Sequence, residues 1–347
     1  MTAPAIDDLL LGESAVMTRV RSLVARLAPT RLPVLIQGPT GAGKELVAQA
    51  LHAASGRPGR FVALNVCAIP DAMVEDTLFG HVRGAFTGAA ADHKGYLREA
   101  DGGTVFLDEI GALSLDGQAK LLRVSETRIF RPVGAAADVQ SDFRLVAATN
   151  VAMASLVRAG RFRGDLAHRI SAAVVTVPPL RDHQEDVPQL ARHFARAAGR
   201  ALSREVDLSV AACDLLAARD WSGNIRELRN VVQAAVALDD GPLLGTDAIR
   251  AALALGEPPA MGRDQGFAGR RLLALLEANA WNTTLVAREL GVHRGTVYRR
   301  IQALGIQLPP VLGRAASARA FASVRANSPG FVANERESQQ PLDQQAT

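Results

Sequence analysis

The sequence predicts an α/β fold: a phosphate-loop type of parallel β-sheet with helices on both faces, followed by an α-helical subdomain and a small all-α helix-turn-helix domain. Short apolar runs alternate with helical segments between residues 33 and 177, which is typical of a parallel sheet covered on both faces. From residue 187 to 253 the apolar periodicity is wholly helical, and helical segments resume from about residue 268 to 304.

The order of the elements follows these runs. Residues 9–27 carry apolar side chains at helical spacing and predict one amphipathic helix. An apolar strand at residues 33–37 leads through a glycine-rich loop into a helix at residues 45–54. Further strands are predicted at residues 61–64, 104–107, 143–147 and 173–177.

Proline, glycine and composition mark the domain boundaries. Pro178 and Pro179 end the last strand, and two prolines and three glycines between residues 256 and 266 indicate a linker. Beyond Pro309 the chain is polar with little periodicity, which predicts disorder. The predicted segments are an α/β subdomain at 1–180, a helical subdomain at 181–255, a linker at 256–267, a helix-turn-helix domain at 268–308 and a disordered tail at 309–347.

Composition restricts the class of protein. The 347 residues are 48% hydrophobic and 21% charged, which fits a globular protein and excludes a fibrous or wholly disordered one. No apolar run reaches the roughly 18 residues that span a bilayer, and no signal peptide is evident, so we expect a cytoplasmic protein with no membrane partner. Cys67 and Cys213 are too few for a disulfide framework, and both are expected in the core.

The positive charge is concentrated in the last quarter of the chain. The net charge is +4, from 39 basic and 35 acidic residues. Residues 263–347 hold 11 Arg and 6 Asp or Glu, a net of +5, and the rest holds 28 basic and 29 acidic residues, a net of −1. A nucleic-acid partner is therefore compatible with the C-terminal segment. Lysine is rare: Lys44, Lys94 and Lys120 stand against 36 Arg.

One of these lysines ends a phosphate-loop motif, G-x-x-x-x-G-K, that lies between a predicted strand and a predicted helix. Glycines let successive amides curl around phosphate oxygens, and the lysine brings a compact charge to the outer phosphates. Glu45 stands where a magnesium-binding hydroxyl is usual. The predicted nucleotide contacts are Gly38, Pro39, Thr40, Gly41, Ala42, Gly43, Lys44 and Glu45.

Polar residues end three of the predicted strands, where open parallel sheets bind ligands. Asp108 and Glu109 follow an apolar strand; Asp108 is expected to bind Mg²⁺ and Glu109 to polarise the attacking water. Asn150, with Thr149, is positioned to sense the terminal phosphate, and Asn65 to relay the nucleotide state through Glu109. Arg163 and Arg169, six apart on a helix edge, fit either a solvated face or a role at a neighbour's nucleotide.

The sequence GAFTGA at residues 84–89 predicts a protruding loop, because two glycines bracket one aromatic and one hydroxyl side chain among alanines. Its six residues are Gly84, Ala85, Phe86, Thr87, Gly88 and Ala89.

GAFTGA between a phosphate loop and a strand ending in LDE resembles the central AAA+ domain of bacterial sigma-54-dependent transcription activators, the enhancer-binding proteins. The resemblance covers roughly residues 11–254 and includes LFGH, ADGGTVFLDEI, LVAATN, VPPLR and GNIREL. In that family a glutamate follows the phosphate-loop lysine, as Glu45 does here. The loop's Pro39-Thr40 differs from the family's usual Glu-Ser.

The resemblance implies ATP and Mg²⁺ as cofactors and a ring, usually a hexamer. It assigns Lys44, Asp108 and Glu109 to the nucleotide. It makes Arg163 and Arg169 arginine fingers acting in trans, Arg226 the second sensor, and Phe86 with Thr87 the contact to sigma-54.

The C-terminal segment is similar to the Fis-type DNA-binding domain of the same family. Asn282 and Thr283 can cap a helix, residues 291–293 form a turn, and a third helix would direct Val297, Ile301 and Leu304 inward. The residues expected to face DNA are His293, Arg294, Thr296, Tyr298, Arg299 and Arg300.

The expected function is sigma-54-dependent activation of transcription: enhancer DNA is bound, and ATP hydrolysis remodels the closed complex of the sigma-54 RNA polymerase holoenzyme. Fewer than forty residues precede the phosphate loop, so we expect regulation by a trans-acting protein, by expression level or by no control at all. Two alternatives stay open. One is a repressor that uses ATP only for assembly; the other is an AAA+ ATPase that remodels another protein.

Overall fold

The computed structural model describes residues 6–256 and, beyond them, residues 272, 275, 276, 279, 281–290, 296, 297 and 301. The chain divides into two compact units, Met1–Pro258 and Pro259–Thr347. The whole of the predicted tail lies outside the described residues, and so does the predicted linker except for its first residue. Five of the predicted DNA contacts also lie outside them. Those five are His293, Arg294, Tyr298, Arg299 and Arg300.

The first unit is built on a five-stranded sheet in the order β2-β3-β6-β1-β7, and every neighbouring pair is parallel. All six residues of β6 are buried, as expected of a central strand in a sheet covered on both faces. The predicted parallel α/β sheet is therefore confirmed. The strands are β1 (Val34–Gln37), β2 (Phe61–Asn65), β3 (Thr104–Asp108), β6 (Arg144–Thr149) and β7 (Ala173–Thr176).

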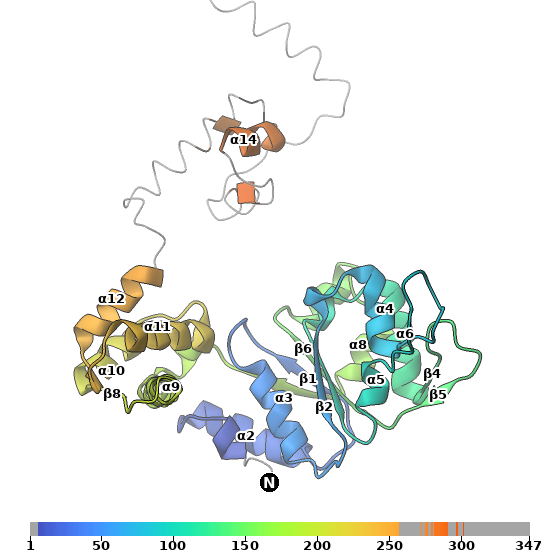
Figure 1. Ribbon diagram of the computed structural model, residues 1–347, viewed down its shortest axis with the longest axis horizontal. Helices are drawn as coiled ribbons and strands as arrows, with labels where there is room; N and C mark the ends of the chain where they lie inside the picture. The colour runs from blue at the N-terminus through green and yellow to red at the C-terminus, as the bar shows by residue number, and fades with distance from the viewer. Residues whose placement is uncertain are drawn as a thin grey trace, which may run out of the picture. The chain divides into compact units, whose positions relative to one another are not determined.

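Two hydrophobic cores lie on the two faces of this sheet (Figure 1). On one face, α2 (Ala15–Leu27) and α3 (Lys44–Ala53) pack against alternate residues of β1, Val34 and Ile36. On the other, α4 (Asp71–Phe79), α6 (Leu115–Thr127) and α8 (Gly164–Ile170) pack around Leu35 and its neighbours. Alternation of side chains along a strand thus supplies both cores. Two short helices, α5 (Tyr96–Glu99) and α7 (Met153–Arg158), complete this part.

The single helix predicted at residues 9–27 is wrong. The structure has α1 (Ile6–Leu9) and α2, separated by a turn. Gly12 has φ = +120°, which a helix cannot accommodate, and the Ser14 hydroxyl accepts from the Met17 amide to cap α2. The apolar periodicity continued through a segment whose glycine and capping serine end one helix and start another.

A small hairpin, which the sequence did not indicate, projects beyond α6. Its strands are β4 (Ile129–Phe130) and β5 (Val139–Gln140), paired antiparallel. The segment between them contacts the residues just before GAFTGA: the Val82 amide donates to the carbonyl of Val133 at 3.1 Å.

The helical subdomain surrounds Trp221 and contains α9 (Val187–Ala201), α10 (Val210–Ala217), α11 (Asn224–Leu238) and α12 (Thr246–Gly256). The expectation of a wholly helical segment is wrong in one detail. Two-residue strands β8 (Asp207–Leu208) and β9 (Leu243–Leu244) pair in parallel. They are too short to interrupt the helical periodicity on either side.

In the second unit, the described residues form a separate apolar cluster that includes Leu276, Val286, Val297 and Ile301. Helix α14 (Thr283–Glu289) is capped by Asn282, whose side chain accepts from the amides of Thr284 and Leu285. The predicted cap and the inward positions of Val297 and Ile301 are confirmed.

The described residues also show where the two cysteines lie and whether any helix could span a membrane. Cys213 is buried, but Cys67 is exposed, so the expected core position of Cys67 is wrong: it lies in the turn η1 (Val66–Ala68) that follows β2. Among the described helices, none is long and apolar enough to cross a bilayer.

A buried carboxylate joins the N-terminal segment to the helical subdomain. Asp186 accepts hydrogen bonds from the amides of Glu13 and Ser14 at 2.8 and 2.9 Å, from the Ser14 hydroxyl at 2.6 Å, and its Oδ2 lies 3.0 Å from His183 Nδ1. Burial by itself would raise the pKa of Asp186, but the hydrogen bonds, led by those from Ser14, outweigh it, so the pKa lies below its ordinary value.

Asp186→Asn should lower the free energy of unfolding near pH 7 by about 2–3 kcal/mol, because the amide nitrogen cannot accept from Ser14 and His183. A lowered folded-state pKa gives stability that is present above the unfolded-state pKa and lost as the pH falls through the folded value. The difference in the free energy of unfolding between wild type and variant should therefore decrease below about pH 4. Urea unfolding from pH 7 to 3 measures this difference, and Asp182→Asn, at an exposed aspartate, is the control. A difference that stays constant over this pH range contradicts a stabilising role of the ionised Asp186 carboxylate.

Candidate functional site

The phosphate-loop motif forms a tight turn at the carboxyl edge of the sheet, between β1 and α3 (Figure 1). Gly41 and Gly43 have φ of +79° and +96°, a region that side-chain-bearing residues rarely adopt. Lys44 is the first residue of α3 and only 7% exposed, and its Nζ donates to the carbonyls of Gly38 at 3.1 Å and Pro39 at 3.3 Å. The lysine charge and the amide end of α3 therefore face the same concave turn, as anion binding requires.

One of the two acids predicted at the end of β3, Glu109, lies beside this turn. Glu109 Oε1 is 3.8 Å from Lys44 Nζ. Glu109 has φ = +53°, and its amide donates to Asp108 Oδ1 at 3.0 Å. A left-handed non-glycine residue that follows a strand of the core directs its carboxylate to the loop instead of continuing the strand, and such strain is often found at functional sites.

The neighbouring strand β6 supplies an amide side chain. Asn150 Nδ2 donates to the Thr40 hydroxyl at 3.0 Å, and the Thr149 carbonyl accepts from the Gly38 amide at 3.3 Å. The structure thus brings Asn150 to the loop, as the sequence predicted, while the buried Thr149 side chain accepts from the Val151 amide.

The helical subdomain holds the loop from the other side. Asn224 Nδ2 donates to the Thr40 carbonyl at 3.0 Å, and the Arg226 amide donates to the Gly41 carbonyl at 3.2 Å. A Cβ on Gly41 would lie 2.3 Å from the Gly223 carbonyl, so only glycine fits there. Asn224 is not among the predicted site residues, although it lies in the motif GNIREL that contains Arg226.

Two hollows flank the loop. One, of about 420 Å³, is lined by Gly38, Pro39, Asn150, Arg181 and Asn224 among others. On the subdomain side, the exposed Arg226 lines a second groove together with Thr40. Polar and cationic side chains thus surround the phosphate loop on both sides.

A third hollow, of about 260 Å³, is mainly apolar and opens beside Gly43. The segment between α1 and α2, α3 and the helices α9 and α11 contribute its walls, including Leu10, Leu46, Phe194 and Ile225. The sequence did not reveal this pocket, because its walls come from four distant segments. A flat apolar ring system fits such a space.

The predicted relay residue has a different partner from the one expected. Asn65 is in register with Asp108 across β2 and β3, but its side-chain oxygen accepts from the Cys67 amide at 3.0 Å while Glu109 faces Lys44. Partial burial, and then the negative charges of Glu109 and Asp108, raise the pKa of the Cys67 thiol. Asn65 and the two acids are therefore neighbours.

The two predicted finger arginines are exposed and bonded away from the phosphate loop of their own chain. Arg163 precedes α8 and donates to both carboxylate oxygens of Asp165, at 3.1 and 2.7 Å. This pairing raises the pKa of Arg163 and lowers that of Asp165. Arg169 Nη2 donates to the Ser125 carbonyl at 2.9 Å. Their exposure on α8 leaves them accessible to another molecule.

The GAFTGA segment forms an exposed loop between α4 and α5, as predicted. The Gly84 amide donates to the Ala89 carbonyl at 2.9 Å and closes the loop, and both Gly84 and Gly88 have positive φ. Phe86 is 46% exposed and Thr87 is exposed, while Ala89 is buried at the base.

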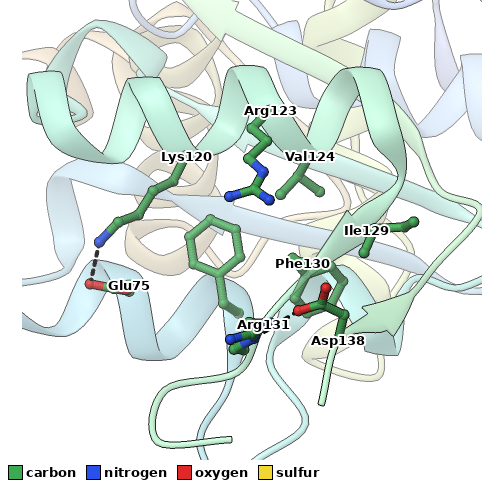
Figure 2. Close-up of a pocket in the computed structure, with 9 residues that line it drawn as sticks. Glu75, Lys120, Arg123, Val124, Ile129, Phe130, Arg131 and Asp138 are labelled. Atoms are coloured by element: carbon green, nitrogen blue, oxygen red, sulfur yellow. Dashed lines mark hydrogen bonds and ion pairs between the residues drawn. The ribbon is translucent and has the colours of Figure 1, made fainter. Parts of the chain in front are cut away.

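A separate groove of about 410 Å³ lies between α4, α6 and the β4–β5 hairpin (Figure 2). Phe79, Val124 and Phe130 form its apolar part, and Lys120 Nζ lies 2.7 Å from Glu75. The hydrogen bond that Lys120 donates to Glu75, with a second to Asp116, raises the pKa of Lys120 despite its partial burial. None of the residues that line this groove belongs to the phosphate loop, so it is distinct from the candidate site.

Fold and site together define an AAA+ nucleotide-binding domain with its helical lid. Three family models match the chain: "Sigma-54 interaction domain" at residues 10–176, "AAA+ ATPase lid domain" at 181–264, and "Bacterial regulatory protein, Fis family" at 269–304. The chain belongs to the family of sigma-54-dependent transcriptional regulators.

Named relatives agree with this membership. The Nif-specific regulatory protein of Azotobacter vinelandii is 39% identical over 87% of this chain and 60% of its own length. The regulator ZraR of Escherichia coli is 41% identical over 84% of this chain and 68% of its own. Crystal structures of NtrX from Brucella abortus with ADP and with ATP superpose with TM-scores of 0.63 and 0.61, at 33% identity over 86% of this chain and 69% of NtrX. This chain thus spans 60 to 69% of the length of these three relatives.

Asn224→Ala should weaken ATP binding about five- to thirtyfold, because the Thr40 carbonyl and the Leu180 amide lose a side chain that bonds both and the loop is less firmly held. Titration with a fluorescent ATP analogue measures the change. Gln189→Ala, on the exposed part of α9, is the matched control. Unchanged affinity in Asn224→Ala contradicts a role of the lid in holding the loop.

Proposed function

We propose that this protein is an ATP-hydrolysing transcription activator that binds upstream enhancer DNA and remodels the closed complex of sigma-54 RNA polymerase in the cytoplasm. One observation carries the proposal: a phosphate loop with Lys44 facing Glu109 occurs in the same compact unit as an exposed loop that presents Phe86 and Thr87. Membership of the family joins these two sites to one function.

In this proposal the phosphate loop, residues 38–44, binds the phosphates of ATP, and the apolar hollow beside Gly43 receives the base. Asp108 fits Mg²⁺, which usually takes one or two carboxylates and completes its shell with phosphates and water. That donor set agrees with the described residues, which contain no cluster of three His, Cys, Asp or Glu side chains that could hold a metal without a nucleotide. When bound, Mg²⁺ would neutralise phosphate charge.

The protein's own residues would carry the remaining steps. Glu109, released from Lys44 when phosphate takes the lysine charge, would polarise the attacking water. Asn150 and Arg226 would sense the terminal phosphate from the sheet and from the lid. Asn65, next to Asp108, would pass the nucleotide state toward α4.

Assembly is the second part of the proposal. Arg163, just before α8, and Arg169, on α8, are both exposed, so they could complete the nucleotide site of an adjacent subunit in a ring. The resemblance to the family implies that this ring is a hexamer. An arginine finger supplied in trans stabilises the charge of the transition state and can accelerate phosphoryl transfer by roughly 10³-fold or more.

DNA binding is assigned to the second unit. The +5 charge of residues 263–347 and the match to the Fis family support it. Thr296 is the described member of the predicted DNA-facing set. A trans-acting regulator protein remains a proposed further partner. The exposed Phe86 and Thr87 favour sigma-54 contact over a repressor that uses ATP only for assembly.

Thr87→Ala should leave ATP hydrolysis unchanged and reduce open-complex formation roughly thirtyfold, as expected for the loss of a central contact residue. A reconstituted sigma-54 promoter with purified polymerase and ATP provides both measurements. Thr18→Ala, exposed on α2, is the control and should behave as wild type. A Thr87→Ala protein that still opens promoters contradicts the proposed mechanism.

A further inference from the structure

The aromatic tip of the GAFTGA loop does not stand free of the protein. The ring of Phe86 packs edge-on against the ring of His81, with 4.9 Å between centroids and an interplanar angle of 65°. This is the favoured geometry for an aromatic pair, in which the ring edge of one meets the face of the other. Phe86 is therefore covered on one side and open to solvent on the other, at 46% exposure.

His81 belongs to the fixed base of the loop and not to the loop itself. Its Nδ1 contacts the carboxylate of Asp76, which lies in the last turn of α4. Its backbone forms an antiparallel bridge with His93, with both N–H to carbonyl distances at 2.9 Å, and the two rings are 5.8 Å apart. Side chain and backbone thus hold the imidazole in one place.

The loop, by contrast, contains two glycines that lie in open space. A Cβ added at Gly84 or Gly88 would meet nothing within 4 Å, and both residues have positive φ, so they can act as hinges. The loop also comes close to the hairpin segment, where a Cβ on Gly134 would lie 2.7 Å from the Cβ of Ala85. The contact between the His81 and Phe86 rings therefore joins the tip of a loop with two hinge glycines to its fixed base.

We propose that His81 is a positioning residue: it holds Phe86 against the base of the loop in the conformation seen here and thereby sets how often the tip is free to reach sigma-54. This inference rests on the proposed function of the loop. Asp76 contacts the imidazole at its Nδ1, and the ring itself supplies the contact to Phe86. An aromatic pair of this kind shifts an equilibrium between a docked and a free tip by about two- to twelvefold.

Two substitutions separate the ring contact from the hydrogen bond. His81→Gln keeps a polar partner for Asp76 and removes the ring, whereas His81→Phe keeps the ring and removes the hydrogen bond. Hydrogen exchange of the Gly84 and Ala89 amides, which close the loop, reports its opening without sigma-54. Exchange should be two- to twelvefold faster in His81→Gln and close to wild type in His81→Phe, with ATP hydrolysis equal in all three.

Equal exchange in wild type and His81→Gln overturns the proposal, as does equally fast exchange in the two variants. If His81→Gln does not fold, Phe86→Ala removes the same contact from the other side and should accelerate exchange by the same factor; no acceleration there also overturns it.

Binding to purified sigma-54 with ADP present completes the test. His81→Gln should bind two- to twelvefold more tightly than wild type and His81→Phe equally; a loosened loop with unchanged sigma-54 affinity overturns the positioning role. If wild type and every variant fail to bind sigma-54 under all nucleotide conditions, the proposed function of the loop is wrong, while the exchange measurements still decide whether His81 holds Phe86.

Discussion

The structure depends on one constraint: the phosphate loop must keep a turn that its own sequence cannot hold alone. Glycines permit the positive φ angles, but two partners hold the turn in place. The carboxyl edge of the sheet supplies Asn150 and the Thr149 carbonyl, and the lid supplies Asn224 and the Arg226 amide. Lys44 and Glu109 come within 3.8 Å because this turn and the end of β3 lie at the same edge. Separating lid from sheet would therefore disturb the phosphate site itself.

The same edge begins one covalent route from the nucleotide site to the exposed loop. Asn65 ends β2 beside Asp108, and η1, α4 and the base of the loop follow in direct succession. Helix α4 packs its buried Val74 and Leu78 into the core, so a well-packed helix separates the nucleotide site from the base of the loop. Near the end of α4, Asp76 contacts His81, and the His81 ring in turn packs against the ring of Phe86.

Much of this was predictable from the sequence because the signals are local. The phosphate loop, the acids after β3 and the cap at Asn282 each show their chemistry within a few residues. What the sequence did not reveal depends on distant segments. Asn224 acts by bonding the Thr40 carbonyl, the apolar hollow is assembled from four segments, and His81 contacts Phe86 through a turn. The break before α2 and the exposure of Cys67 were mispredicted because apolar character continued where backbone geometry and tertiary packing decided otherwise.

Calorimetric titration of ATP with Mg²⁺ into Lys44→Ala tests most directly whether this loop is the phosphate site. Lys120→Ala is the matched control, since that lysine pairs with Glu75 in a groove away from the loop. We expect wild-type affinity in Lys120→Ala and binding weaker by roughly tenfold or more in Lys44→Ala, because the phosphates lose a charge-assisted partner. Equal affinity in Lys44→Ala and wild type would contradict it.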